Sequence, residues 1–160
     1  MAKARDISLT IAIYLWATIL GGIVYSHIVF FPAYLAALPS SASHVTGPYA
    51  MHDEHFWLFI HPLMIITLAV TLILNWRVRE RRNLIAISAA IYVAAIISTI
   101  LYFVPELQAF RASPTSTVSA AEWFARGQRW QHLSWTRGAF MFAGLLPLLL
   151  ALRRASIAAR

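Results

Sequence analysis

Four long apolar segments dominate this chain and restrict the folds that it can adopt. They cover about residues 7–34, 53–76, 83–104 and 132–152. Each holds the roughly 20 apolar residues that a helix needs to cross the hydrocarbon core of a bilayer. Only 12% of the 160 residues are charged, whereas soluble domains carry about 25% charged residues. We therefore predict a single membrane domain, residues 1–160, that folds as an all-α, four-helix antiparallel transmembrane bundle with the lipid bilayer as its partner.

Basic residues gather at one end of the predicted spans. Nine of the thirteen lie there: Lys3, Arg5, Arg77, Arg79, Arg81, Arg82, Arg153, Arg154 and Arg160. The loop between the first two spans has none. This asymmetry predicts cytoplasmic termini, because basic residues stay on the cytoplasmic side of a membrane. The net charge of +7 thus sets orientation, and we expect no nucleic-acid partner. The absence of cysteine excludes disulfides and thiolate ligands.

The connection 105–131 is the least membrane-like part, and we predict an outer loop with a short helix. Pro105 is expected to stop the third span. Residues 120–130 read as a helical approach to the fourth span, with Glu122 and Arg126 at i,i+4 spacing. Gly21 and Gly22 can let a helix approach closely, within one chain or in a homo-oligomer.

Ionisable residues cluster at the end of the spans opposite to the basic residues. At a rise of about 1.5 Å per residue, His27, His55, Glu106 and His132 lie about 30–34 Å from the basic ends of their spans. The same count places His61 and Arg137 about two turns deeper. Ionisable groups near hydrocarbon are costly, so they indicate a functional site.

Three imidazoles and one carboxylate are enough ligands for copper, non-haem iron or zinc. His27, His61 and His132 are the candidate ligands, with Glu106 as a fourth ligand or proton acceptor. His55 is a reserve ligand, since it points about 120° away from His61 on a regular helix. Two of the same histidines would instead serve as axial ligands of haem b.

Arginines and aromatic residues surround the same end. Arg126 and Arg129 can pair with haem propionates or an anionic substrate, and Arg137 can orient Glu106 or an anionic group. A flat apolar ligand would be walled by aromatic rings, for which the candidates are Tyr25, Tyr49, Trp57, Tyr102, Trp123, Trp130 and Trp135. Each feature also has a structural interpretation: an interfacial aromatic belt, histidines that only form hydrogen bonds, and a Glu106–Arg137 ion pair.

At these positions the chain resembles the anthrone-oxygenase-like family of small four-helix bacterial membrane proteins. The resemblance is carried by Gly22-Ile-Val-Tyr-Ser-His27, Phe31-Pro32, Gly47-Pro48-Tyr49, Phe56-Trp57-Leu-Phe-Ile-His61-Pro62, Tyr102-Phe-Val-Pro-Glu106, and Arg129-Trp130-Gln-His132 with Arg137. It implies the four-helix fold, a bacterial inner membrane and oxygen-dependent oxidation of a polyphenolic anthrone to a quinone.

Three hypotheses follow for function. The first is a metal-dependent oxidoreductase, with an oxygenase as its narrower form, acting on a lipophilic aromatic or quinone-like substrate at the outer, periplasmic face. The second is a b-type haem electron-transfer protein. The third is a non-catalytic membrane protein that binds a ligand or assembles with partners. Metal content and an optical spectrum distinguish the three.

Overall fold

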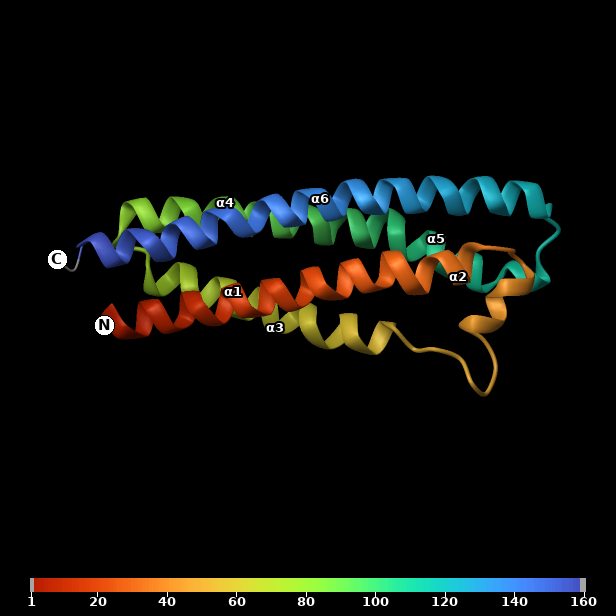
Figure 1. Cartoon of the computed structure of the whole chain (residues 1–160), viewed down its shortest axis with the longest axis horizontal. Helices are drawn as coiled ribbons and strands as arrows, with labels where there is room; N and C mark the ends of the chain where they lie inside the picture. Colours follow the sequence, from red (N-terminus) through yellow and green to blue (C-terminus); the bar gives the residue numbers. More distant parts are fainter. Residues whose placement is uncertain (1, 159–160) are drawn as a thin grey trace. The chain divides into compact units, whose positions relative to one another are not determined.

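The computed structural model describes residues 2–158, with side chains up to Arg154, so Arg160 lies outside the described residues. The described part is almost entirely helical and contains no strand. Its elements are α1 (Ala2–Tyr25), a π-helical segment Ser26–Phe30, α2 (Phe31–Leu35), a 3-10 turn Ser40–His44, α3 (Glu54–Leu74), α4 (Arg79–Ser98), a π-helical segment Thr99–Phe103, α5 (Val104–Arg111), a 3-10 turn Ser113–Thr115 and α6 (Ala120–Ala158) (Figure 1).

These elements join into four helical stretches that are long and apolar enough to cross a membrane. They are Ala2–Leu35, Glu54–Leu74, Arg79–Arg111 and Ala120–Arg154. The predicted fold class, an all-α four-helix antiparallel transmembrane bundle, is therefore confirmed, and the chain is an integral membrane protein by the length and composition of its helices.

The boundary predictions around 105–131 were wrong in two respects. The third helix does not stop at Pro105, which lies in the first turn of α5. Residues 120–131 are no separate short helix, because α6 runs from Ala120 without a break. Its start is set by Ser119, whose side-chain oxygen accepts a hydrogen bond from the Glu122 backbone N–H at 3.2 Å. Ser-x-x-Glu is the sequence pattern of a capped helix start.

The helices contribute to two compact units, which are described separately. The first comprises Met1–Gly21, Glu54–Ala94 and Ala139–Arg160, and the second Gly22–Asp53 and Ala95–Gly138.

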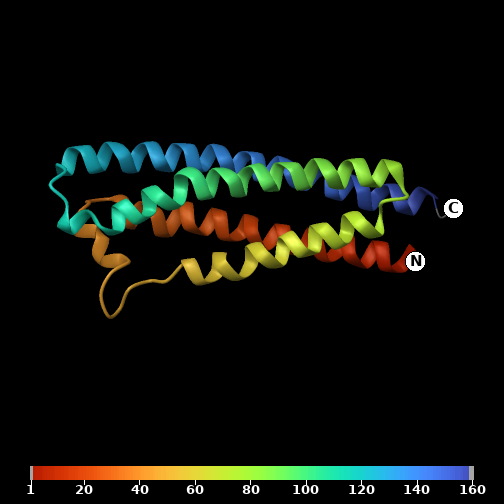
Figure 2. The same ribbon diagram turned by 180° about the vertical axis from the view of Figure 1, so that it is seen from behind.

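One end of the first unit brings together the start of α1, the α3–α4 turn and the end of α6 (Figures 1 and 2). Arg81 is 3% exposed and connects all three. Its guanidinium donates to Asp6 Oδ1 at 2.6 Å, to Asn75 Oδ1 at 3.1 Å and to the Ala151 carbonyl at 3.1 Å. Because α1 and α4 begin where α3 and α6 end, neighbouring helices along the chain run antiparallel.

Polar side chains join the helices of this unit through backbone carbonyls. Trp16 Nε1 donates to the Met141 carbonyl at 2.9 Å, and Ser88 Oγ donates to the Gly144 carbonyl at 2.7 Å. A Cβ on Gly144 would lie 2.6 Å from the Trp16 ring, so glycine is required for this close approach. A close contact at Gly21 within the chain is not present, since nothing within 4 Å would meet a Cβ there, and a contact between chains stays a prediction.

The second unit has an aromatic core formed by residues of the α1–α2 end, the α4–α5 end and the start of α6. Its fully buried members include Phe110 and Trp130. The core consists of Phe30, Phe31, Tyr34, Leu35, Leu38, Ala42, Val45, Phe103, Phe110, Trp123 and Trp130.

Candidate functional site

His27 is the buried histidine of the second unit, and both of its ring nitrogens are hydrogen bonded. It lies in the π-helical segment Ser26–Phe30 and is 4% exposed. Nδ1 lies 2.7 Å from the Ile23 carbonyl oxygen, which only accepts, so Nδ1 carries a proton and donates it. Nε2 lies 2.8 Å from Ser134 Oγ on α6. In the neutral ring Nε2 therefore accepts the Ser134 hydroxyl proton.

Arg137 extends this contact to a third helical segment. Its Nη2 donates to Ser134 Oγ at 3.0 Å, and its Nη1 donates to Thr99 Oγ1. Thr99 Oγ1 in turn donates to the Ala95 carbonyl at 2.7 Å. We call His27, Ser134, Arg137 and Thr99 the Arg137 network. Its two chains of hydrogen bonds both start at Arg137 and end on backbone carbonyls, so every hydroxyl in it has an acceptor.

The Arg137 network contains a cation but no anion. Among the side chains described, no carboxylate pairs with Arg137. Its guanidinium carbon lies 3.9 Å from the centroid of the Phe103 ring, which supplies a cation–π contact. The His27 ring lies 4.6 Å from the Trp135 ring centroid and 5.5 Å from that of Phe31. The network is thus enclosed by aromatic rings and keeps a positive charge.

Both π-helical segments carry a member of the network and precede a proline. His27 lies before Pro32, and Thr99 lies before Pro105. Proline has no N–H, and its ring clashes with the carbonyl four residues earlier in a regular helix. A π turn widens the helix at that point, so the helix continues past the proline. Such turns are frequent at functional sites.

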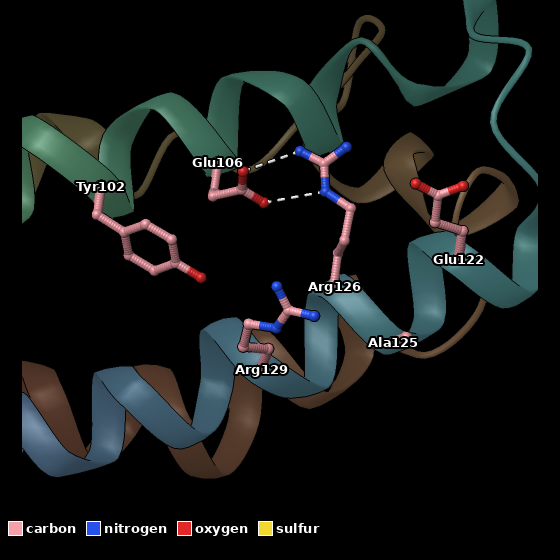
Figure 3. Close-up of a pocket in the computed structure, with 6 residues that line it drawn as sticks. All are labelled: Tyr102, Glu106, Glu122, Ala125, Arg126 and Arg129. Atoms are coloured by element: carbon pink, nitrogen blue, oxygen red, sulfur yellow. Dashed lines mark hydrogen bonds and ion pairs between the residues drawn. The ribbon is translucent and has the colours of Figure 1, made fainter.

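A cavity of about 300 Å³ opens beside this region, between the α4–α5 end and the start of α6 (Figure 3). Glu106 forms a two-point ion pair there with Arg126, at 2.9 Å and 3.2 Å. Arg129 extends its guanidinium toward the same space, as does the Tyr102 hydroxyl (Figure 3). The lining consists of Tyr102, Glu106, Glu122, Ala125, Arg126 and Arg129.

Arg129 differs from Arg126 in having no partner. In the part of the chain with described side chains, no hydrogen bond or ion pair to its guanidinium occurs. Arg126 is held by Glu106 and also covers the Trp123 ring, with its guanidinium carbon 4.5 Å from the ring centroid. The cavity therefore offers one guanidinium that is already neutralised and one that is available.

The first unit contains a second hydrogen-bonded histidine, the half-buried His61, whose partner is the buried Tyr92. His61 Nδ1 lies 2.6 Å from the Tyr92 hydroxyl, and Tyr92 is 1% exposed. The Trp57 ring stacks on His61 with centroids 5.4 Å apart, and Trp16 lies at the same distance from Tyr92. This pair belongs to the interior of α3, α4 and α1, and its tyrosine was not foreseen from the sequence.

The candidate metal ligands do not form one cluster within the second unit. His132 is exposed on α6, two positions before the buried Ser134. Two positions turn a helix by about 200°, so His132 points away from the Ser134 side that meets His27. His55 and His61 belong to the first unit, and His55 is exposed near the start of α3.

The expected Glu106–Arg137 pair was wrong. Glu106 pairs with Arg126, while Arg137 binds the hydroxyls of Thr99 and Ser134. Glu122, which was expected to pair with Arg126 at i,i+4 spacing, instead lines the cavity.

The expected aromatic wall is distributed over different environments. Trp130 is 1% exposed and donates from Nε1 to the Phe103 carbonyl at 3.1 Å, so it belongs to the core. Trp135 contacts His27, Trp57 contacts His61, and Tyr25 is 61% exposed. None of these four residues lines the cavity, but Tyr102, which was also expected in the wall, does.

Sequence reasoning missed Ser134 and Thr99 as members of the network. Ser134 lies three positions before Arg137, a spacing that places both on one helix face. Thr99 gave no signal beyond a hydroxyl in an apolar run six residues before Pro105.

No protein-family model matches the chain, and we found no similar curated protein and no similar solved structure. The resemblance to the anthrone-oxygenase-like family therefore rests on the residue pattern and stays a prediction. The fold and the site define the class of protein: a small four-helix integral membrane protein with an aromatic-enclosed arginine network and an adjacent charged cavity.

Proposed function

We propose that this protein binds a lipophilic molecule that carries an acidic or carbonyl oxygen, and that the cavity lined by Tyr102 and Arg129 receives that oxygen. The observation that carries the proposal is the guanidinium of Arg129, which has no partner among the described side chains and extends into the cavity. Guanidinium binds carboxylate, phosphate and phenolate oxygens through charge-assisted hydrogen bonds. The Tyr102 hydroxyl adds a second donor.

Residue counts along the chain support a position at the bilayer surface. Twenty residues span a hydrocarbon core of about 30 Å. Counted from Asn83, this distance ends near Phe103, next to Tyr102. Counted back from Arg153, it ends near Leu133, which follows Arg129 by four residues in the chain. The cavity would then lie at headgroup level, where an amphipathic molecule holds its polar end.

The side of the membrane follows from the basic residues. If the basic ends are cytoplasmic, as the positive-inside rule predicts, the cavity lies on the outer face. We propose the periplasmic face of a bacterial inner membrane, and the family resemblance supplies the bacterial origin.

The Arg137 network would act as a positioning group for the cavity. Ser134 and Arg137 belong to the same helix as Arg129, and Thr99 to the same helical stretch as Tyr102. The hydrogen bond from Arg137 to Thr99 therefore joins the two helical stretches that supply the cavity lining, and the bond to Ser134 orients Arg137 on α6. We assign no contact with the ligand to Arg137.

Native mass spectrometry of the purified protein tests this proposal. The wild-type protein should retain an acidic amphiphile from the membrane, and Arg129→Gln should lose most of it. Arg79→Gln, a change to an exposed arginine of α4, is the matched control and should retain it. Equal retention by all three proteins would rule out the cavity as the binding site.

A second proposal retains the oxidoreductase that the resemblance implies, with a transition metal ion or haem b as cofactor. The observation that favours it is the hydrogen bond between the half-buried His61 and the buried Tyr92, with Trp57 stacked on His61 and Trp16 against Tyr92. A phenol can pass its proton to a hydrogen-bonded imidazole when it loses an electron, which makes such a pair suited to redox chemistry.

His27 does not fit the role of metal ligand in this proposal. A ligating histidine commonly donates one N–H to a backbone carbonyl, as His27 does to Ile23. Its other nitrogen, however, is bonded to Ser134, which also accepts from the Arg137 cation. A metal ion at Nε2 would displace that bond and face a guanidinium of like charge. Elemental analysis and an optical spectrum test this proposal: metal or haem bound at about one per chain and lost in His61→Ala supports it, and neither being present contradicts it.

A further inference from the structure

The cavity holds a second unpaired charge, and this charge is negative. Glu122 lines the cavity, and no ion pair or side-chain hydrogen bond to its carboxylate occurs in the part of the chain with described side chains. Its helix neighbour Arg126, the natural i,i+4 partner, is taken by Glu106. The charged residues of the cavity lining are thus the Glu106–Arg126 ion pair and two residues of opposite charge, Glu122 and Arg129, that have no partner among the described side chains.

Helix geometry places the two open charges on one side of α6. Glu122 and Arg129 are seven positions apart, which corresponds to about 700° of rotation, or within about 20° of the same direction. Seven positions also separate their backbones by about 10.5 Å along the helix axis. At this separation, with Arg126 between them, they suit a ligand that places opposite charges at two points of one head.

From this pattern we infer that the polar head of the ligand is zwitterionic, with an anionic phosphate at Arg129 and Tyr102 and an ammonium at Glu122. This inference rests on the proposed function and names its ligand class: a phospholipid headgroup of the ethanolamine type. The bilayer supplies such heads at the level where residue counts place the cavity.

The ammonium is primary rather than quaternary. A carboxylate accepts N–H hydrogen bonds, which a primary ammonium donates. A quaternary ammonium is instead recognised by a cage of aromatic faces. Tyr102 supplies one ring to the lining, but the neighbouring Trp123 ring is covered by Arg126. The cavity lining therefore matches ethanolamine better than choline.

Isothermal titration calorimetry on the purified full-length protein in detergent tests the inference. The probes are dihexanoyl phosphatidylethanolamine, dihexanoyl phosphatidylglycerol and free phosphoethanolamine. We expect phosphatidylethanolamine to bind best. Glu122→Gln should lower the affinity for phosphatidylethanolamine roughly fivefold, as expected for one partly solvated charge contact, and should leave the affinity for phosphatidylglycerol unchanged. Glu80→Gln, which removes an exposed carboxylate of α4, is the matched control and should change neither.

The outcomes separate this inference from the proposed function. If Arg129→Gln lowers the affinity for both lipids about tenfold or more but Glu122→Gln changes neither affinity, the cavity binds an anionic head and the inference of a zwitterionic head is wrong. If Arg129→Gln affects neither lipid, the proposed function itself fails. Binding of free phosphoethanolamine as tight as that of the lipid would overturn the membrane source of the ligand.

Discussion

The two units each contain a buried or partly buried arginine, and the two arginines differ in the groups that bind them. Arg81 in the first unit donates to a carboxylate, a side-chain amide and a backbone carbonyl. Arg137 in the second unit donates only to hydroxyls and lies over an aromatic ring. A carboxylate neutralises the first cation, whereas the second stays positive. Arg81 therefore serves to join helix ends, whereas Arg137 keeps its positive charge in the unit that contains the cavity.

The same contrast recurs within the cavity. Arg126 is paired with Glu106, and Arg129 is unpaired among the described side chains. Arg129 is exposed, so its guanidinium is open to a ligand, whereas that of Arg126 is already bound by a carboxylate. Three substitutions and one final measurement test whether this distinction holds.

Arg81→Met should have the largest effect on stability. It leaves Asn75 without its donor and Asp6 without its ion pair, and it removes the hydrogen bond from α4 to the Ala151 carbonyl of α6. We expect the free energy of unfolding to fall by about 3 kcal/mol, less than for a fully buried pair because Asp6 is half exposed. Unfolding of the purified protein in detergent, monitored by circular dichroism, measures this change. Arg79→Met is the control, and a loss as large there would remove the special role of Arg81.

Gly144→Ala should lower the free energy of unfolding by about 2 kcal/mol, since its Cβ would press against the rigid Trp16 ring. The same measurement on Gly21→Ala provides the contrast. A Cβ at Gly21 meets nothing within 4 Å, and alanine favours a helix over glycine by about 1 kcal/mol. Destabilisation by both changes, to the same extent, would contradict the assigned close approach.

Ser134→Ala should cost about 1 kcal/mol, because hydrogen bonds between membrane helices contribute about that much. It removes the acceptor of Arg137 and the donor to His27. Thr136→Ala is the matched control, since the Thr136 hydroxyl donates only to the His132 carbonyl of its own helix. A network that positions the cavity also predicts weaker retention of the bound amphiphile in Ser134→Ala. Unchanged stability and retention would show that the network positions nothing.

The four spans, the antiparallel fold and the basic end could be predicted because apolar length and charge asymmetry are properties of composition along the chain. Position along the helices could be predicted as well, since a helix rises uniformly: Glu106 and Arg129 had been expected at the same end of their helices, and both line the cavity. The rotation of each helix about its axis could not be predicted from the sequence. Glu106 was expected to pair with Arg137 but pairs with Arg126, because a residue count does not tell which face of α6 meets α5.

Local departures from regular helix geometry were the other feature that could not be predicted from the sequence. Pro105 was read as a stop, yet the π-helical segment Thr99–Phe103 carries the helix past it. That segment also places Thr99 where it accepts from Arg137. In this chain Pro32 and Pro105 both follow a widened turn and neither ends its helix.

The central claim is that Arg129 binds a ligand and contributes little to the fold. The most direct test measures unfolding free energy and bound amphiphile on the same preparation of Arg129→Gln. We expect stability within about 0.5 kcal/mol of the wild type, as for surface substitutions, together with loss of most of the retained acidic amphiphile. Full retention of the amphiphile, or a loss of stability comparable to that of Arg81→Met, would contradict the claim.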